Sequence, residues 1–158
     1  MSRARPGVKR DRELVFLVAE DNHIDMELLM HAVQHSGMTV NVQVAGDGEE
    51  AIEYLLGKGK FADRQAHPFP DLIVLDLKMP RMDGLDVLKW LRAHREFAGI
   101  PTVMLSGSGL EKDVKEAYEL GVRTYFTKPY ELEKLRELIR LMVDYWWRSE
   151  RPNIQPSN

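Results

Sequence analysis

The sequence contains no cysteine, and its first apolar run is short. Without cysteine the chain forms no disulfide and offers no thiolate nucleophile, which suits a reducing compartment. The apolar run at residues 14–19 is far shorter than a signal-peptide core or a membrane span requires. We therefore expect a cytoplasmic protein without a membrane segment.

A large excess of charge of one sign is also lacking. The 158 residues carry a net charge of -3, which gives no general attraction to nucleic acid. The exception is the opening MSRARPGVKRDR, and we interpret residues 1–12 as a flexible basic leader rather than as an arm for nucleic acid or anionic lipid. The length suits one domain, which we place at residues 13–148. The tail, 149–158, leaves no room for a DNA-binding output domain.

Short runs of apolar and β-branched residues alternate along the chain with stretches of helical period. The apolar runs cover residues 14–19, 39–45, 71–75, 101–105 and 122–126. This alternation predicts an α/β protein with a flavodoxin-like, doubly wound parallel sheet of five strands in the order 2-1-3-4-5. The five helices are expected at about residues 22–36, 47–56, 84–95, 108–118 and 131–148.

Two helix starts carry recognisable capping residues. Asp47 is expected to cap the second helix, with Glu50 three residues later. Ser108 and Glu111 are expected to form a capping box at the start of the fourth helix. A long polar loop at residues 57–70 lies outside the alternating pattern.

Acidic residues follow two of the predicted strands. Glu20 and Asp21 come directly after the first strand, and Asp76 comes at the end of the third. In the predicted order these strands are neighbours, so the three carboxylates converge at one edge of the sheet. Like charges at such distances repel unless a cation neutralises them. Carboxylate oxygens favour a hard cation, and we predict Mg²⁺.

The remaining strand ends carry complementary groups. Ser106 places a hydroxyl at the end of the fourth strand, and Lys128 places an ammonium at the end of the fifth. A central carboxylate, a metal site, a hydroxyl and an ammonium together suit the formation of an acyl phosphate on Asp76.

Four motifs in this order resemble the receiver domain of two-component response regulators. They are AEDN, LDLKMPRMDG, LSGSG and YFTKP, and the resemblance extends from about residue 14 to residue 148. The long loop at 57–70 and the tryptophan-bearing last helix resemble the stand-alone receivers that serve bacterial phytochrome-type kinases.

The resemblance assigns a phosphoacceptor and its metal ligands. It implies that Asp76 accepts a phosphoryl group from the phosphohistidine of a sensor histidine kinase. Mg²⁺ would be bound by Asp21, Asp76 and the backbone carbonyl of Lys78, and by Glu20 through water.

The resemblance also implies a conformational switch. Lys128 would pair with the phosphoryl oxygens, and its bond to Pro129 would be cis. Ser106 would move to the phosphoryl group and Tyr125 would follow it inward. This motion would repack the face made by the fourth helix, the fifth strand and the fifth helix. The signal would then pass through protein contacts, by relay to a histidine phosphotransfer protein, or by feedback on the kinase.

Three aromatic residues close the last helix, and they cannot all face one core. Tyr145, Trp146 and Trp147 form either a hydrophobic clasp on the domain or a surface for a second copy. We predict the second, and with it a homodimer.

Other functions fit the residues less well. A phosphatase or phosphomutase with an aspartyl nucleophile usually has a second Asp two residues later, where this chain has Lys78. A flavin carrier needs a phosphate-binding loop after the first strand, but EDNHID is acidic. The complete set of strand-end residues also argues against a pseudo-receiver, which would be a binding module that is never phosphorylated. We therefore expect a signalling protein limited to its own phosphorylation and dephosphorylation, and not an enzyme.

Overall fold

A computed structural model describes residues 13–150. The predicted leader, and the part of the tail beyond residue 150, lie outside the described residues. The elements in chain order are β1 (Leu14–Ala19), α1 (His23–Gln34), β2 (Val40–Ala45), α2 (Gly48–Leu56), a short 3-10 helix (Gly59–Phe61), β3 (Leu72–Leu75), α3 (Gly84–Ala93), β4 (Thr102–Ser106), α4 (Glu111–Glu119), β5 (Thr124–Thr127) and α5 (Leu132–Arg148).

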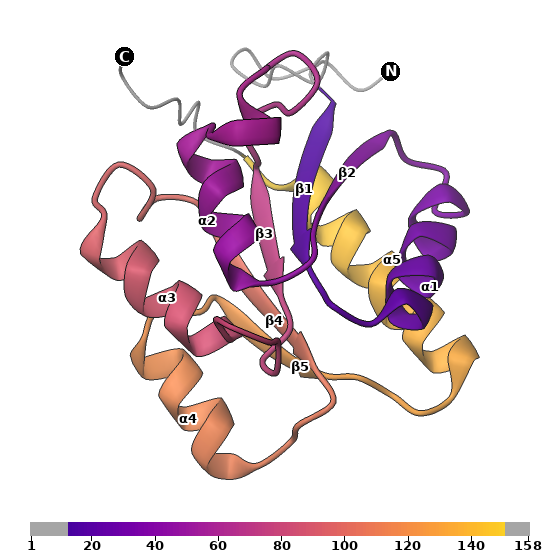
Figure 1. Cartoon of the computed structure of the whole chain (residues 1–158). Coiled ribbons are helices and arrows are strands. Elements are labelled where there is room, and N and C mark those ends of the chain that lie inside the picture. The colour runs from indigo at the N-terminus through magenta and orange to yellow at the C-terminus, as the bar shows by residue number, and fades with distance from the viewer. Residues whose placement is uncertain (1–12, 151–158) are drawn as a thin grey trace.

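The described strands form one parallel sheet in the order β2-β1-β3-β4-β5, which confirms the predicted topology. Figure 1 shows α1 and α5 on one face of this sheet and α2, α3 and α4 on the other. Because the strands are parallel, their carboxyl ends lie side by side along one edge of the sheet, and the chain continues from there into the helices.

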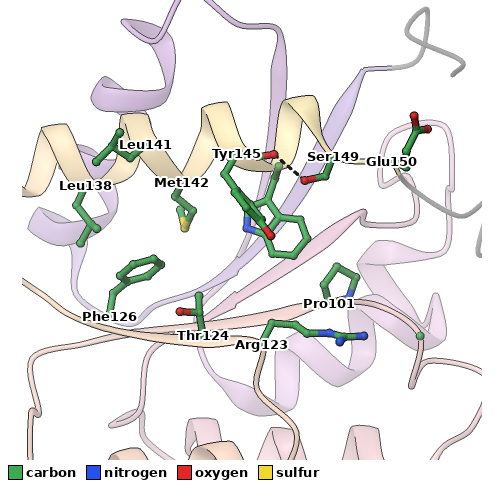
Figure 2. Close-up of a pocket in the computed structure, with 12 residues that line it drawn as sticks. Pro101, Arg123, Thr124, Phe126, Leu138, Leu141, Met142, Tyr145, Ser149 and Glu150 are labelled. Carbon is green, nitrogen blue, oxygen red and sulfur yellow. Dashed lines mark hydrogen bonds between the residues drawn. The ribbon is translucent and has the colours of Figure 1, made fainter. Parts of the chain in front are cut away.

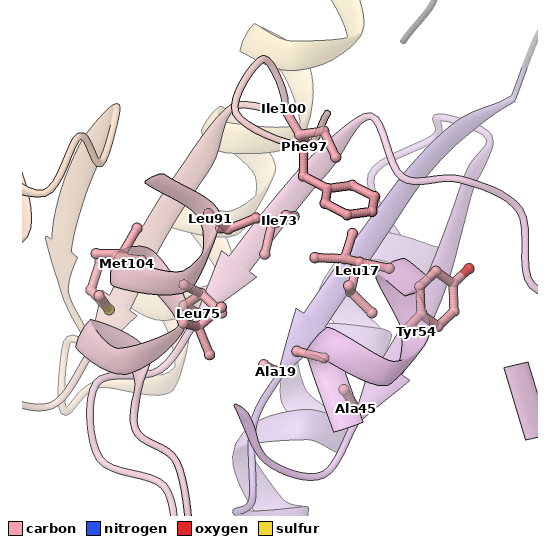
Figure 3. Packing of buried hydrophobic residues seen from close by; sticks show 14 of the residues in the cluster. Leu17, Ala19, Ala45, Tyr54, Ile73, Leu75, Leu91, Phe97, Ile100 and Met104 are labelled. Atoms are coloured by element: carbon pink, nitrogen blue, oxygen red, sulfur yellow. The ribbon is translucent and has the colours of Figure 1, made fainter. Parts of the chain in front are cut away.

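Both faces of the sheet are buried, which explains why the strands are almost continuously apolar. Successive residues of β1 point to opposite faces, so Phe16 packs toward α1 and α5 while Leu17 packs toward α2 and α3. Figure 3 shows the second of these clusters, in which Leu17 lies beside the ring of Tyr54 and Ile73 lies beside Leu91 of α3. This burial fixes the register of β1 on β3.

The two predicted caps have different outcomes. Asp47 caps α2 as expected, with its carboxylate accepting a hydrogen bond from the backbone N–H of Glu50. The predicted capping box of Ser108 and Glu111 is wrong. The hydroxyl of Ser108 donates to Asp113 at 2.6 Å instead, and α4 begins at Glu111 without a side-chain cap.

The loop before β3, which was predicted to be polar, is fastened to α2. It contains the buried ring of Phe61. Arg64 donates to the carbonyls of Tyr54 and Leu55 in the last turn of α2, each at 2.7 Å. The hydroxyl of Tyr54 donates to the carbonyl of Pro68 at 2.6 Å. The loop is therefore part of the packed fold.

A close backbone contact explains the glycine that follows Asp76 in the motif LDLKMPRMDG. The N–H of Gly84 donates to the carbonyl of Leu77 at 2.8 Å, which brings the start of α3 back against the end of β3. A Cβ atom at residue 84 would lie 2.3 Å from the carbonyl oxygen of Asp76. The turn therefore closes only with glycine at this position.

The substitution Gly84→Ala tests this contact. We expect it to lower the free energy of unfolding by about 2 kcal/mol or more, because the backbone of β3 has to shift to admit the methyl group. Gly107→Ala is the matched control, since a Cβ there meets no atom within 4 Å and should change the stability by less than about 0.5 kcal/mol. Urea unfolding measures both, and equal stabilities of the two variants would contradict the prediction.

Candidate functional site

The pairing of β1 with β3 determines where the acidic residues lie. Ala19 is aligned with Leu75, and each is the last residue of its strand. The N–H of Asp76 donates to the carbonyl of Ala19 at 3.0 Å, and the N–H of Glu20 donates to the carbonyl of Ala45 at 3.1 Å. The side chains after β1 and β3 therefore stand next to each other at the edge of the sheet.

The three predicted acids are brought together. Glu20, Asp21 and Asp76 each offer a carboxylate oxygen, and these atoms all lie within 4.8 Å of one another. Glu20 is buried, Asp76 is half-buried and Asp21 is exposed. Such a set of oxygen donors, open to solvent on one side, fits a hard divalent cation that keeps part of its water shell.

The loop after Asp76 offers a further oxygen. Among residues 13–150, no hydrogen bond is donated to the carbonyl of Lys78, whereas its neighbour Leu77 accepts one from Gly84. The Lys78 carbonyl is therefore free to face a ligand. Its side chain is exposed.

Lys128 reaches three carboxylates from the end of β5. Its ammonium group donates to Glu20 at 2.6 Å and to Asp25 at 2.9 Å, and it forms an ion pair with Asp76 at 3.5 Å. The sequence had suggested Glu20 and Asp76 as neighbours of this lysine, but not Asp25. An acid in the first turn of a helix is common, because the helix dipole favours it there, so nothing in the sequence set Asp25 apart.

Three carboxylates thus contact one ammonium group, and a fourth, that of Asp21, lies beside two of them, so negative charge is in excess. Burial raises the pKa of Glu20 to about 7; the hydrogen bond from Lys128 opposes this effect and the charge of Asp76 adds to it. For Lys128, burial would lower the pKa, but the hydrogen bonds to Glu20 and Asp25 outweigh burial and raise it. The site therefore favours an added positive charge, carried by a proton or by a cation.

The ends of β4 and β5 carry the other predicted residues. Ser106 is buried and accepts a hydrogen bond on its hydroxyl oxygen from the N–H of Ser108. Its carbonyl accepts from the N–H of Lys128 at 2.7 Å, so the two strand ends are joined beside the acids. The hydroxyl of Tyr125 donates to the carbonyl of Ser108 at 2.6 Å, which links the end of β4 to the middle of β5.

The prediction of a cis bond between Lys128 and Pro129 is wrong. The described residues, 13–150, contain no cis peptide bond. The trans form is the ordinary state even before proline, where it is favoured by about 0.5–1 kcal/mol.

The three aromatic residues of α5 differ in exposure. Trp146 and Trp147 pack against the cluster beneath α5, whereas 65% of Tyr145 is exposed. Tyr145 and Leu141 line a groove of about 810 Å³ between α5 and the edge strand β5, as Figure 2 shows. The groove runs along β5, because Arg123, Thr124 and Phe126 also line it.

No helix within residues 13–150 is both long enough and apolar enough to cross a lipid bilayer.

The raised pKa of Glu20 predicts a pH dependence of stability. Because its pKa of about 7 in the folded protein exceeds the ordinary 4.5, its contribution is complete below about pH 4.5 and is lost as the pH rises through 7. Glu20→Gln should remove this loss. Relative to that variant, we expect the wild type to become less stable by roughly 1–3 kcal/mol between about pH 4.5 and pH 8.

The measurement is urea unfolding in the presence of EDTA across this pH range. Glu27→Gln is the control, because Glu27 is exposed on α1 and should leave the pH profile unchanged. A constant difference in stability between wild type and Glu20→Gln at every pH would contradict the assignment.

Comparison with known proteins places these residues in a family. Residues 16–140 match the model of the response regulator receiver domain. Response regulator Rcp1 of Synechocystis sp. is 32% identical over 132 residues, which span 84% of this chain and 88% of Rcp1. The probable methanogenesis regulatory protein FilR2 of Methanothrix harundinacea is 30% identical, with 84% of this chain and 83% of FilR2 covered.

Solved structures agree with this match. The phosphorylated cyanobacterial phytochrome response regulator RcpA is 32% identical, superposes with a TM-score of 0.83, and is matched over 90% of this chain and 100% of RcpA. The Mn²⁺-bound form of Rcp1 is 31% identical, has a TM-score of 0.80, and is matched over 88% of this chain and 99% of its own. The chain belongs to the response regulator receiver domain family, the phosphoacceptor proteins of two-component signalling.

Proposed function

We propose that the chain is a single-domain response regulator whose phosphoacceptor is Asp76. The observation that carries this proposal is the position of Asp76 at the end of β3, grouped with Glu20 and Asp21 and 3.5 Å from the ammonium group of Lys128. A nucleophilic carboxylate there has a cation site on one side and a fixed positive charge on the other. This arrangement suits phosphoryl transfer, which depends mainly on positioning and on neutralising charge.

The transfer proceeds between a histidine and a carboxylate. A carboxylate oxygen of Asp76 attacks the phosphorus of a phosphohistidine in the sensor kinase. The new P–O bond forms as the P–N bond breaks, and the imidazole leaves with the electron pair of that bond. Asp76 then carries an acyl phosphate, which water later hydrolyses.

The proposed metal is Mg²⁺, bound by Asp21, Asp76 and the carbonyl of Lys78, and by Glu20 through water. The oxygen donors and the excess of negative charge support a divalent cation. A Mn²⁺-bound form of the relative Rcp1 has been solved. When bound, the cation supplies positive charge to the phosphoryl oxygens.

The residues at the ends of β4 and β5 convert phosphorylation into a change of surface. Lys128 pairs with a phosphoryl oxygen, and the Ser106 hydroxyl turns to another. Tyr125 then moves inward and gives up its hydrogen bond to the carbonyl of Ser108. Because Tyr125 lies on β5 next to α4, its movement alters the face formed by α4, β5 and α5.

The proposed partners follow from the proposed role of Asp76 as phosphoacceptor. The donor is a sensor histidine kinase of phytochrome type, as the names of RcpA and of a red-light regulator from R. palustris suggest. A histidine phosphotransfer protein is the further partner that we propose, as recipient of the phosphoryl group. We assign the receiver domain to residues 13–148, with flanking segments at 1–12 and 149–158, and place the protein in the cytoplasm. The only reactions that we propose for it are its own phosphorylation and dephosphorylation.

The groove beside β5 supports the proposed homodimer. Tyr145 and Leu141 are large, exposed and adjacent on α5, and they line an apolar groove against an edge strand. Trp146 lines the same groove from below, and Trp147 packs beside it in the underlying cluster. A second copy that buried this surface would remove apolar area from water.

Phosphorylation by a small donor tests the phosphoacceptor. Incubation with acetyl phosphate and Mg²⁺, followed by intact mass measurement, should show the gain of one phosphoryl group. The gain should disappear in Asp76→Asn and in wild type with EDTA, because the nucleophile or the cation is then lost. Asp83→Asn is the control, since Asn caps α3 about as well as Asp and lies at the same edge. An undiminished gain in Asp76→Asn would refute the proposal.

Replacement of Tyr145 tests the dimer. We expect the wild type to dimerise and Tyr145→Ala to weaken dimerisation about tenfold or more, because large aromatic residues dominate the binding energy of interfaces. Tyr130→Ala is the control, since Tyr130 is another exposed tyrosine but lies outside the groove. Light scattering across a range of concentrations measures the effect. A monomeric wild type at all concentrations would rule the dimer out.

A further inference from the structure

We propose that Asp25 is a positioning residue that holds Lys128 in the unphosphorylated protein and thereby slows phosphorylation of Asp76. This inference rests on the proposed function. It assigns a role in the same site to a residue that the sequence analysis did not single out.

The distances show that Lys128 is held by two acids and only approached by the third. Its ammonium nitrogen lies 2.6 Å from Glu20 and 2.9 Å from Asp25, both hydrogen-bonding distances, but 3.5 Å from Asp76. The lysine side chain is 12% exposed, so few waters are available to replace a lost partner. Two of the three N–H donors of the ammonium group are used by Glu20 and Asp25, so these charge-assisted bonds set the distance from which Lys128 meets a phosphoryl group on Asp76.

Asp25 stands apart from the acids that would hold a cation. Among the described residues, the group of carboxylates close enough to bind one metal ion comprises Glu20, Asp21 and Asp76, without Asp25. A cation at that group would neutralise Glu20 and Asp76, which compete with the phosphoryl group for Lys128. Asp25 lies outside that group, and it would continue to hold the ammonium group of Lys128.

The backbone holds Asp25 in place. It lies in the first turn of α1, where the side chain of Asn22 accepts hydrogen bonds from the N–H groups of Ile24 and Asp25 at 3.0 and 3.1 Å. The carboxylate is 31% exposed, so its removal leaves no buried acid without a partner. Lys128 retains its bond to Glu20 after such a change, and the fold should tolerate it.

The test is the rate of phosphorylation by acetyl phosphate at saturating Mg²⁺. Asp25→Asn should be phosphorylated about tenfold faster than wild type, because Lys128 is no longer held by a second charged partner and one repulsive carboxylate has gone. Asp25→Ala should behave in the same way. Asp25→Glu, which restores a carboxylate on the same turn, should stay within about threefold of wild type.

Two controls separate this role from others. Glu27→Gln removes one negative charge from an exposed position of the same helix and should leave the rate unchanged. The Mg²⁺ concentration that gives half the maximal rate should be the same, within about twofold, in wild type and Asp25→Asn, because Asp25 is not among the metal-binding acids.

The outcomes are distinguishable. No phosphorylation of wild type would refute the proposed function itself. Normal phosphorylation of wild type with no acceleration in Asp25→Asn and Asp25→Ala would overturn the role of Asp25 alone. An equal acceleration in Glu27→Gln would replace it with a general effect of charge. A large change in Mg²⁺ dependence would assign Asp25 to the metal site instead.

Discussion

The structure depends on the balance between one buried ammonium group and the carboxylates around it. Glu20, Asp25 and Asp76 all lie within 3.5 Å of the Lys128 nitrogen, and Asp21 stands beside them. A single positive charge cannot neutralise four negative ones, and burial makes the imbalance more costly than it would be in water. Burial raises the pKa of Glu20, and the charge of Asp76 adds to this effect. The same excess of negative charge makes the site receptive to a divalent metal.

The fold creates this concentration of charge by ordinary packing. Apolar side chains on both faces of the sheet fix β1 against β3 in one register, and the residues that follow each strand therefore meet. The turn after Asp76 then has to leave the sheet at once. Gly84 allows this, because its missing side chain lets α3 start directly against the carbonyl of Asp76. The favourable packing of the core thus keeps the like charges close together at the carboxyl ends of the strands.

The sequence predicted the parts of the site that depend on strand ends. Alternating apolar runs located the strands to within about two residues, and the acids at Glu20, Asp21 and Asp76 followed from parallel topology. Contacts between residues far apart in the chain could not be predicted from the sequence. Asp25 looked like an ordinary acid at a helix start, and Arg64 gave no sign that it would bond the end of α2. Ser108 was misread because Asp113 competes for its hydroxyl.

The loop that carries Lys78 is also bonded to the start of α2. Arg81 adopts a left-handed backbone conformation with φ of 65°, which costs energy for a residue with a side chain. Its guanidinium group pairs with the buried carboxylate of Asp47 at the start of α2, and the carbonyl of Met82 accepts from the N–H of Gly48. These bonds hold the strained turn in one shape. A cation bound by the Lys78 carbonyl would therefore be positioned by α2 as well as by β1 and β3.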